Sequence, residues 1–194
     1  MYTEKKFNLP ELKGLSKESV DAHLGLYAGY VKNYNAIIAA QSELMVDSEK
    51  NALTLAELTR RLGFEFDGMR LHEYYFTQWE EGAKELPGGS LKGALAKQFG
   101  SFDAWLAQFK AIGSMRGPGW AILYYDKTVG AFQIAWIEEQ HLGHFATLPI
   151  ILALDVWEHA FITDFGTTGR GKYISAFFEN LNWSVIEKRF EEAK

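Results

Sequence analysis

The chain has 194 residues, which is enough for one compact domain or two small ones with a buried core. Apolar residues make up 47% of it and aromatic residues 15%, which excludes a disordered protein, because disordered chains are poor in both. The net charge of -5 argues against nucleic acid or an anionic membrane as the main partner, since both attract cationic surfaces.

Cysteine is absent, which excludes disulfides, thiolate metal sites and cysteine nucleophiles. Any metal site must therefore use histidine and carboxylate ligands. The first twelve residues lack the apolar core of a signal peptide, and the longest apolar stretch, 146–154, is too short to cross a bilayer. We therefore expect a cytoplasmic protein without a membrane partner.

The first half of the chain predicts helices. Ser16 precedes a segment in which a histidine and three tyrosines recur at steps of three and four, which places them on one helix face. These residues are His23, Tyr27, Tyr30 and Tyr34. Thr54 and Glu57 match a capping box for a second helix, which Gly63 is expected to end.

A third helix is expected to follow Gly63. Gly68, His72, Tyr75 and Trp79 fall on one face of it, at steps of four, three and four. Turn residues then cluster at 85–90, between two periodic regions, and we place a domain boundary there. The prediction is an all-helical domain at 1–86 and an α+β domain at 87–194.

The second half mixes helices and strands. Ser101 can cap a helix that ends before 117–119, and segments 121–125 and 131–137 predict a β-hairpin. The third strand, 150–154, is continuously apolar and is expected to be buried on both faces. Helical patterns resume at 157–161 and at 173–181, and Ser184 with Glu187 matches a capping box for a last helix.

Asp155 directly follows the buried strand, and His159 lies four residues later. A buried carboxylate without a partner tends to take up a proton, so Asp155 requires a cation, strong hydrogen-bond donors or a metal. A shared metal ion explains both residues. The alternative is that Asp155 caps a helix that begins at Val156, while His159 is a hydrogen-bonded core histidine.

Two further histidines are expected to point into an aromatic interior. His72 shares its helix face with Tyr75, and His23 shares its face with Tyr27. Each could be structural when taken alone. Three core-facing histidines together with Asp155, in a chain that has 5 histidines, favour a metal site, and this ligand set suits iron, manganese or zinc.

The segment 155–161, Asp-Val-Trp-Glu-His-Ala-Phe, closely resembles the signature of iron/manganese superoxide dismutases. Further similarities extend along nearly the whole chain: His23 with Gly25, segment 30–33, His72 with Tyr75, segment 100–102, Gly119-Trp120 and segment 181–183. The resemblance implies a long helical hairpin, then an α+β part with a small antiparallel three-stranded sheet, and a metal between them.

By the same resemblance, one iron or manganese ion per subunit would be held by His23, His72, Asp155, His159 and one solvent molecule. One superoxide anion would be oxidised to dioxygen and another reduced to hydrogen peroxide. A glutamine or histidine is expected to hydrogen-bond the bound solvent. Gly68 cannot do so, which leaves Gln140 or His141; we favour Gln140 by its spacing from Asp155.

The resemblance also implies roles around the ion. Tyr30 resembles the tyrosine that guards the entrance and relays protons, and Arg170 resembles a cation that draws in superoxide. Glu158 would bond to His159 of a second subunit, which implies a homodimer, with a higher oligomer also open. An aromatic wall would consist of Tyr75, Trp120 and Trp157. Each of these side chains could equally be ordinary core or surface.

Two other functions use the same ligands. The chain could be a family-related protein that stores manganese or iron, or binds a partner, with weak or no dismutase activity. It could also hold a non-haem iron oxygenase or hydrolytic zinc site, although those favour more open ligand sets. The ligands do not distinguish iron from manganese, and Gly68 with Gln140 favours the manganese-type or metal-tolerant arrangement.

Overall fold

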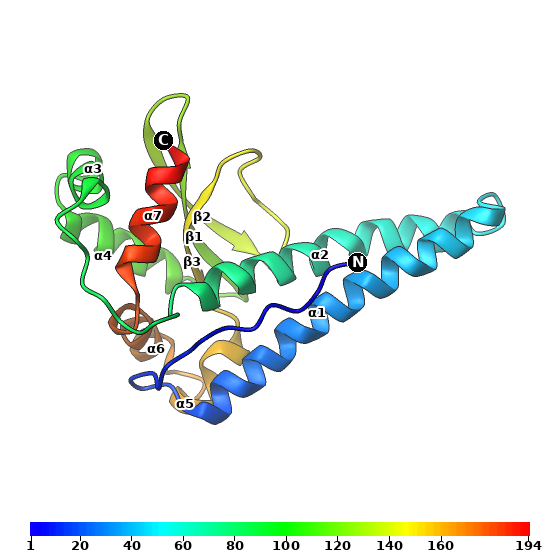
Figure 1. The fold of residues 1–194 in the computed structure, drawn as a ribbon, viewed down its shortest axis with the longest axis horizontal. Helices are drawn as coiled ribbons and strands as arrows, with labels where there is room; N and C mark the ends of the chain where they lie inside the picture. The colour runs from blue at the N-terminus through cyan, green and yellow to red at the C-terminus, as the bar shows by residue number, and fades with distance from the viewer.

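Two long helices form a hairpin that projects from the rest of the molecule (Figure 1). The computed structural model describes residues 1–194. Helix α1 spans Lys17–Leu44 and α2 spans Ala52–Thr77, with a short 3-10 helix, Met45–Asp47, at the turn. The other elements are α3 (Ser90–Phe99), α4 (Phe102–Gly113), β1 (Gly119–Asp126), β2 (Ala131–Glu138), β3 (Ile150–Asp155), a 3-10 turn (Glu158–Ala160), α5 (Ile162–Phe165), α6 (Arg170–Glu179) and α7 (Trp183–Ala193).

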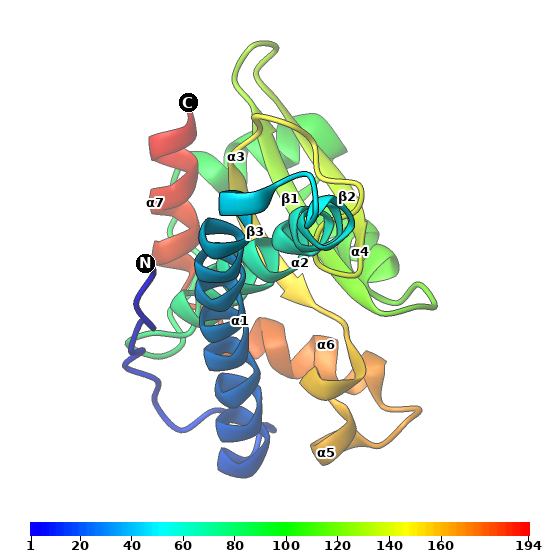
Figure 2. The same ribbon diagram turned by 90° about the vertical axis from the view of Figure 1, so that its right-hand side faces the viewer.

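The three strands form one antiparallel sheet in the order β2-β1-β3. Helix α7 lies along β3, and α4 contacts β1 and β2 (Figure 2). Strand β3 is buried along nearly its whole length, as its apolar run predicts, and β1 with β2 is the predicted hairpin. The structure thus confirms the predicted fold class.

The outer edge of β3 is closed by side chains instead of a fourth strand. The Gln78 amide donates to the Ala153 carbonyl at 2.8 Å, and its oxygen accepts from the Ala153 N–H at 2.9 Å. The half-buried Arg189 side chain donates to the carbonyl of Tyr74 at 2.8 Å and that of Ile151 at 3.3 Å. Because an uncovered edge invites pairing with other chains, these contacts protect β3 and join it to the end of α2.

One hydrophobic core joins the hairpin to the sheet and the later helices. It extends from Tyr27 in α1 and Tyr75 in α2 through Trp120 in β1 to Phe177 in α6. The boundary near residue 86 falls between α2 and α3, and separate folding of the two parts stays a prediction. None of the helices combines the length and apolar character that crossing a membrane requires.

The helix limits predicted around Gly63 were wrong. Gly63 lies inside α2, which runs unbroken past His72, so the expected second and third helices are one. Glycine costs only about 1 kcal/mol inside a helix, which packing along the hairpin can offset. The helix also begins before Thr54, and the Glu57 carboxylate does not form a capping box, because it accepts hydrogen bonds from Arg60 at 2.6 and 2.8 Å.

The capping box predicted for the last helix was also wrong. Helix α7 begins at Trp183, and Asn182 accepts from the Ser184 N–H at 3.2 Å. The Glu187 carboxylate instead accepts from the Leu91 N–H in the first turn of α3, at 3.2 and 3.3 Å. The residue before α3 is a glycine without a capping side chain, so Glu187 supplies the missing acceptor from a distant helix.

Candidate metal centre

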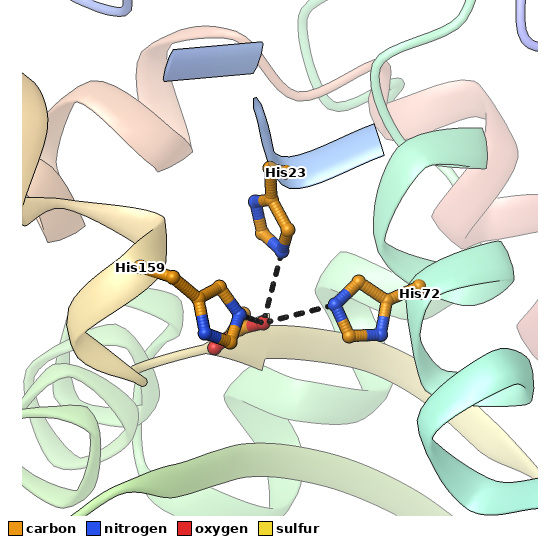
Figure 3. A group of neighbouring side chains, drawn as sticks. His23, His72 and His159 are labelled. Atoms are coloured by element: carbon orange, nitrogen blue, oxygen red, sulfur yellow. Dashed lines mark hydrogen bonds and ion pairs between the residues drawn. The ribbon is translucent and has the colours of Figure 1, made fainter. Parts of the chain in front are cut away.

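Four side chains from distant parts of the chain meet in the seam between the hairpin and the sheet. The Nε2 atoms of His23 and His159 each lie 3.2 Å from Asp155 Oδ2, and that of His72 lies 3.6 Å from it. The four candidate ligand atoms all lie within 4.8 Å of one another. Figure 3 shows the three imidazoles pointing to a common centre, each from a different element.

The helices hold His23 and His72 in defined orientations. Ser16 caps α1 by accepting from the Ser19 N–H, as predicted, and the helix places His23 two turns further on. His72 donates from Nδ1 to the Gly68 carbonyl at 2.6 Å. Its Nε2 therefore carries a lone pair, and this buried atom has no hydrogen-bond partner in the protein. A bound cation would satisfy it.

Asp155 is the last residue of β3, where it lies opposite Trp120 of β1. Its Oδ1 accepts from the Trp157 N–H at 2.8 Å, while Oδ2 faces the imidazoles. The chain then makes a single 3-10 turn that brings His159 back to the carboxylate. Asp155 thus does accept a backbone N–H, as the capping interpretation expects, but its second oxygen remains directed at three histidines.

The charges at the centre suit a cation. Burial lowers the pKa of His72 to about 3 and also lowers that of His23, so both imidazoles are neutral and can act as ligands. Burial alone would raise the pKa of Asp155, but His159 and His23 hold it below its ordinary value. One carboxylate and three imidazole nitrogens, one of them unpartnered, fit an Fe or Mn ion.

A hydrogen-bonded group lies beside the four residues. Gln140 is fully buried; its amide donates to the Tyr30 hydroxyl at 2.9 Å, and its oxygen accepts from Trp120 Nε1 at 2.8 Å. The Tyr30 ring lies against Gly68, where a Cβ atom would come within 2.5 Å of it. Gly68 therefore makes room for Tyr30, which in turn contacts His72.

His141, the alternative to Gln140, lies elsewhere. Its ring packs against Phe64, with 5.7 Å between the ring centroids, and its Nδ1 lies 4.0 Å from Glu139 Oε2. Of the two neighbours, only Gln140 joins the group around Tyr30.

Aromatic side chains surround the centre, among them the three that the resemblance implies for an aromatic wall. Trp120 and Tyr75 are buried, whereas Trp157 is half-buried and stacks on His159 with 5.9 Å between centroids. The sequence did not indicate the role of Tyr173, whose hydroxyl donates to the Asp155 carbonyl at 2.7 Å and lies 3.0 Å from the Tyr75 hydroxyl. No local pattern marks this residue, because its partners are distant in the sequence.

Arg170 and Glu158 lie near the surface beside the centre. Arg170 donates to the carbonyls of Met115 and Gly117, the latter at 2.9 Å, and its guanidinium lies 3.8 Å from Glu158 Oε1. The Glu158 side chain is 56% exposed, which leaves it accessible to another molecule.

Comparison with known proteins places this arrangement in a family. The family model for the C-terminal domain of iron/manganese superoxide dismutases matches residues 87–189. The iron superoxide dismutase of Sulfolobus acidocaldarius is 34% identical over 92% of this chain and 86% of its own. That of Saccharolobus solfataricus is 32% identical over 97% and 95%. Manganese superoxide dismutase 2 of Haloferax volcanii is 32% identical over 86% and 82%. The chain therefore belongs to the iron/manganese superoxide dismutase family.

Proposed function

We propose that this protein is a superoxide dismutase that uses one iron or manganese ion, with His23, His72, Asp155 and His159 as its ligands. The observation that carries the proposal is the convergence of these four side chains, with their ligand atoms within 4.8 Å of one another, in a chain whose relatives bear that name. The bound ion supplies one-electron chemistry, which lets two superoxide anions and two protons yield dioxygen and hydrogen peroxide.

The protein must also deliver protons, and Tyr30 is suited to this. Its hydroxyl oxygen accepts from the Gln140 amide, so its own proton remains free to be donated. Burial raises the pKa of Tyr30, which keeps the hydroxyl protonated at neutral pH. We therefore assign Tyr30 the role of proton donor, and Gln140 the role of orienting it.

Three aromatic side chains keep water from the centre. Tyr75 and Trp120 are buried against it, and the half-buried Trp157 stacks on His159. Excluding water strengthens every electrostatic interaction at the site, so the dipole of the buried Gln140 amide would act more strongly on the ion than it would in solvent. Arg170 supplies a nearby positive charge that would attract the superoxide anion in a protein of net charge -5.

The proposal includes a homodimer. The exposed Glu158 carboxylate lies next to His159, whose side chain is 23% exposed, so a second copy of the chain could reach both. Light scattering on the purified protein would test this by its mass. A cytoplasmic location stays a prediction from the sequence, and cell fractionation would test it.

The decisive experiment measures superoxide consumption by purified protein of known iron and manganese content, loaded with each metal separately. Catalytic consumption by one or both forms is expected. The variant His159→Ala should bind less metal and lose activity, because one ligand is gone. A wild-type protein that binds the metal stoichiometrically, yet consumes no superoxide beyond the uncatalysed rate, would instead favour the metal-storage function.

A further inference from the structure

The loop between β2 and β3 holds Gln140 in place, and its backbone there is strained. Glu139, directly before Gln140, has a φ of 53°, in the left-handed region that non-glycine residues rarely adopt. Such a conformation is unfavourable and persists only where surrounding contacts impose it. Part of the constraint is the pair of backbone hydrogen bonds between Glu138 and Leu142, at 3.0 and 3.2 Å.

His144 supplies a second constraint, directly on Gln140. Its Nε2 lies 3.0 Å from the Gln140 carbonyl oxygen, and its Nδ1 lies 2.6 Å from the Tyr124 hydroxyl. A carbonyl oxygen can only accept, so Nε2 must carry the hydrogen. A neutral imidazole then has its lone pair on Nδ1, which accepts from the hydroxyl. The Gln140 carbonyl therefore requires this tautomer of His144, and the Tyr124 hydroxyl stabilises it by donating to Nδ1.

These bonds form a continuous directional chain. The Tyr124 hydroxyl donates to His144, which donates to the backbone of Gln140, whose side chain donates to Tyr30. Tyr124 belongs to β1 and is 1% exposed, so the chain starts from a rigid strand of the sheet. The exposed loop is thereby tied to the core at the residue that contacts Tyr30.

We propose that His144, oriented by Tyr124, is a positioning residue that sets the place of the Gln140 amide beside the metal centre. The inference rests on the proposed function for its consequence, because the Gln140 amide orients the proposed proton donor Tyr30 and places its dipole beside the ion. The hydrogen bonds of His144 go to Tyr124 and Gln140 and not to the ligands or Tyr30, so we infer that it acts through Gln140.

The first measurement needs no metal. Imidazole nitrogen chemical shifts from ¹⁵N-labelled, metal-free protein at neutral pH should show His144 protonated at Nε2 and unprotonated at Nδ1. Tyr124→Phe removes only the hydroxyl. In this variant the chemical shift of His144 Nδ1 should move to the value of an unprotonated imidazole nitrogen that accepts no hydrogen bond. Protonation at Nδ1 in the wild type, or identical Nδ1 shifts in the two proteins, would overturn the assigned chain.

The second measurement is the midpoint potential of the metal-loaded protein, in wild type, His144→Phe, Gln140→Ala and the double variant. Introduced into the wild-type protein, His144→Phe should shift the midpoint potential. Introduced into Gln140→Ala, it should shift the potential by less than about half as much, because the effects of residues that act through one another are not additive. Leu142→Ala, in the same loop with an exposed side chain, is the matched control and should leave the potential unchanged.

Two results would overturn the positioning role: no shift in His144→Phe, or equal shifts with and without Gln140. Tyr124→Phe provides the same test should His144→Phe fail to fold. The outcome is independent of turnover. A wild-type protein that binds metal without consuming superoxide refutes the proposed function, while the coupling between His144 and Gln140 can still be read from the potentials.

Discussion

Replacing Gly68 with alanine is expected to destabilise the metal-free protein, although alanine usually stabilises a helix interior. By helix propensity alone the change would gain about 1 kcal/mol. In the structure, however, the new Cβ would lie 2.5, 2.6 and 2.9 Å from three carbon atoms of the Tyr30 ring. These distances are shorter than any real contact, so the ring or the helix must move.

The ring has little freedom to move, because its hydroxyl is bonded to Gln140 and its face contacts His72. Overpacking of this kind costs about 1 to 3 kcal/mol, and an aromatic ring that cannot move away belongs at the upper end of this range. After subtracting the gain of about 1 kcal/mol in helix propensity, we expect a net loss of stability of about 1 to 2 kcal/mol. Gly63→Ala, in the same helix, is the matched control. Its nearest neighbour would be a His141 carbon at 3.7 Å, an ordinary contact, so it should gain up to about 1 kcal/mol.

Urea unfolding of both metal-free variants and the wild type, at one pH, measures the two free energies of unfolding. In the Tyr30→Val background, which lacks the ring, Gly68→Ala should cost less stability than it does in the wild type. The reasoning is refuted if Gly68→Ala is as stable as Gly63→Ala, because the close approach of the Tyr30 ring to Gly68 would then have no effect on the free energy of unfolding.

Two further predictions concern buried polar groups. Because the folded pKa of His72 is about 3 and the unfolded value about 6.5, the neutral imidazole contributes stability above pH 6.5 that is lost as the pH falls toward 3. Between pH 6.5 and 5 the metal-free wild type should therefore lose stability faster than His72→Gln, by on the order of 1 kcal/mol per pH unit. Free energies of unfolding measured with urea at several pH values test this, and an equal dependence on pH in the two proteins would contradict it. Gln78→Leu leaves the N–H and carbonyl of Ala153 without partners at a buried edge and should cost about 2 to 5 kcal/mol in thermal or urea unfolding. Gln133→Leu, on the exposed face of β2, should change stability by no more than about 0.5 kcal/mol, and similar losses in both variants would argue against the edge role.

Local chemistry in the sequence was enough for several features of this protein. The Ser16 cap, the hairpin of β1 and β2, and the buried strand β3 all follow from spacing and apolar runs within short segments. A carboxylate directly after that strand requires a partner, whatever the rest of the fold, because burying an unpaired charge is costly. Together with three core-facing histidines, this carboxylate predicted the group of four side chains that the structure brings together.

Only the tertiary structure decided which distant groups meet. The sequence favoured Gln140 over His141 only by its spacing from Asp155, whereas the structure shows the Gln140 amide donating to the Tyr30 hydroxyl. Glu187 has the spacing of a capping residue for its own helix, yet its carboxylate binds α3. Both outcomes depend on hydrogen bonds between segments far apart in the chain. A local pattern carries no information about these, since each group bonds to whichever partner the folded chain brings within reach.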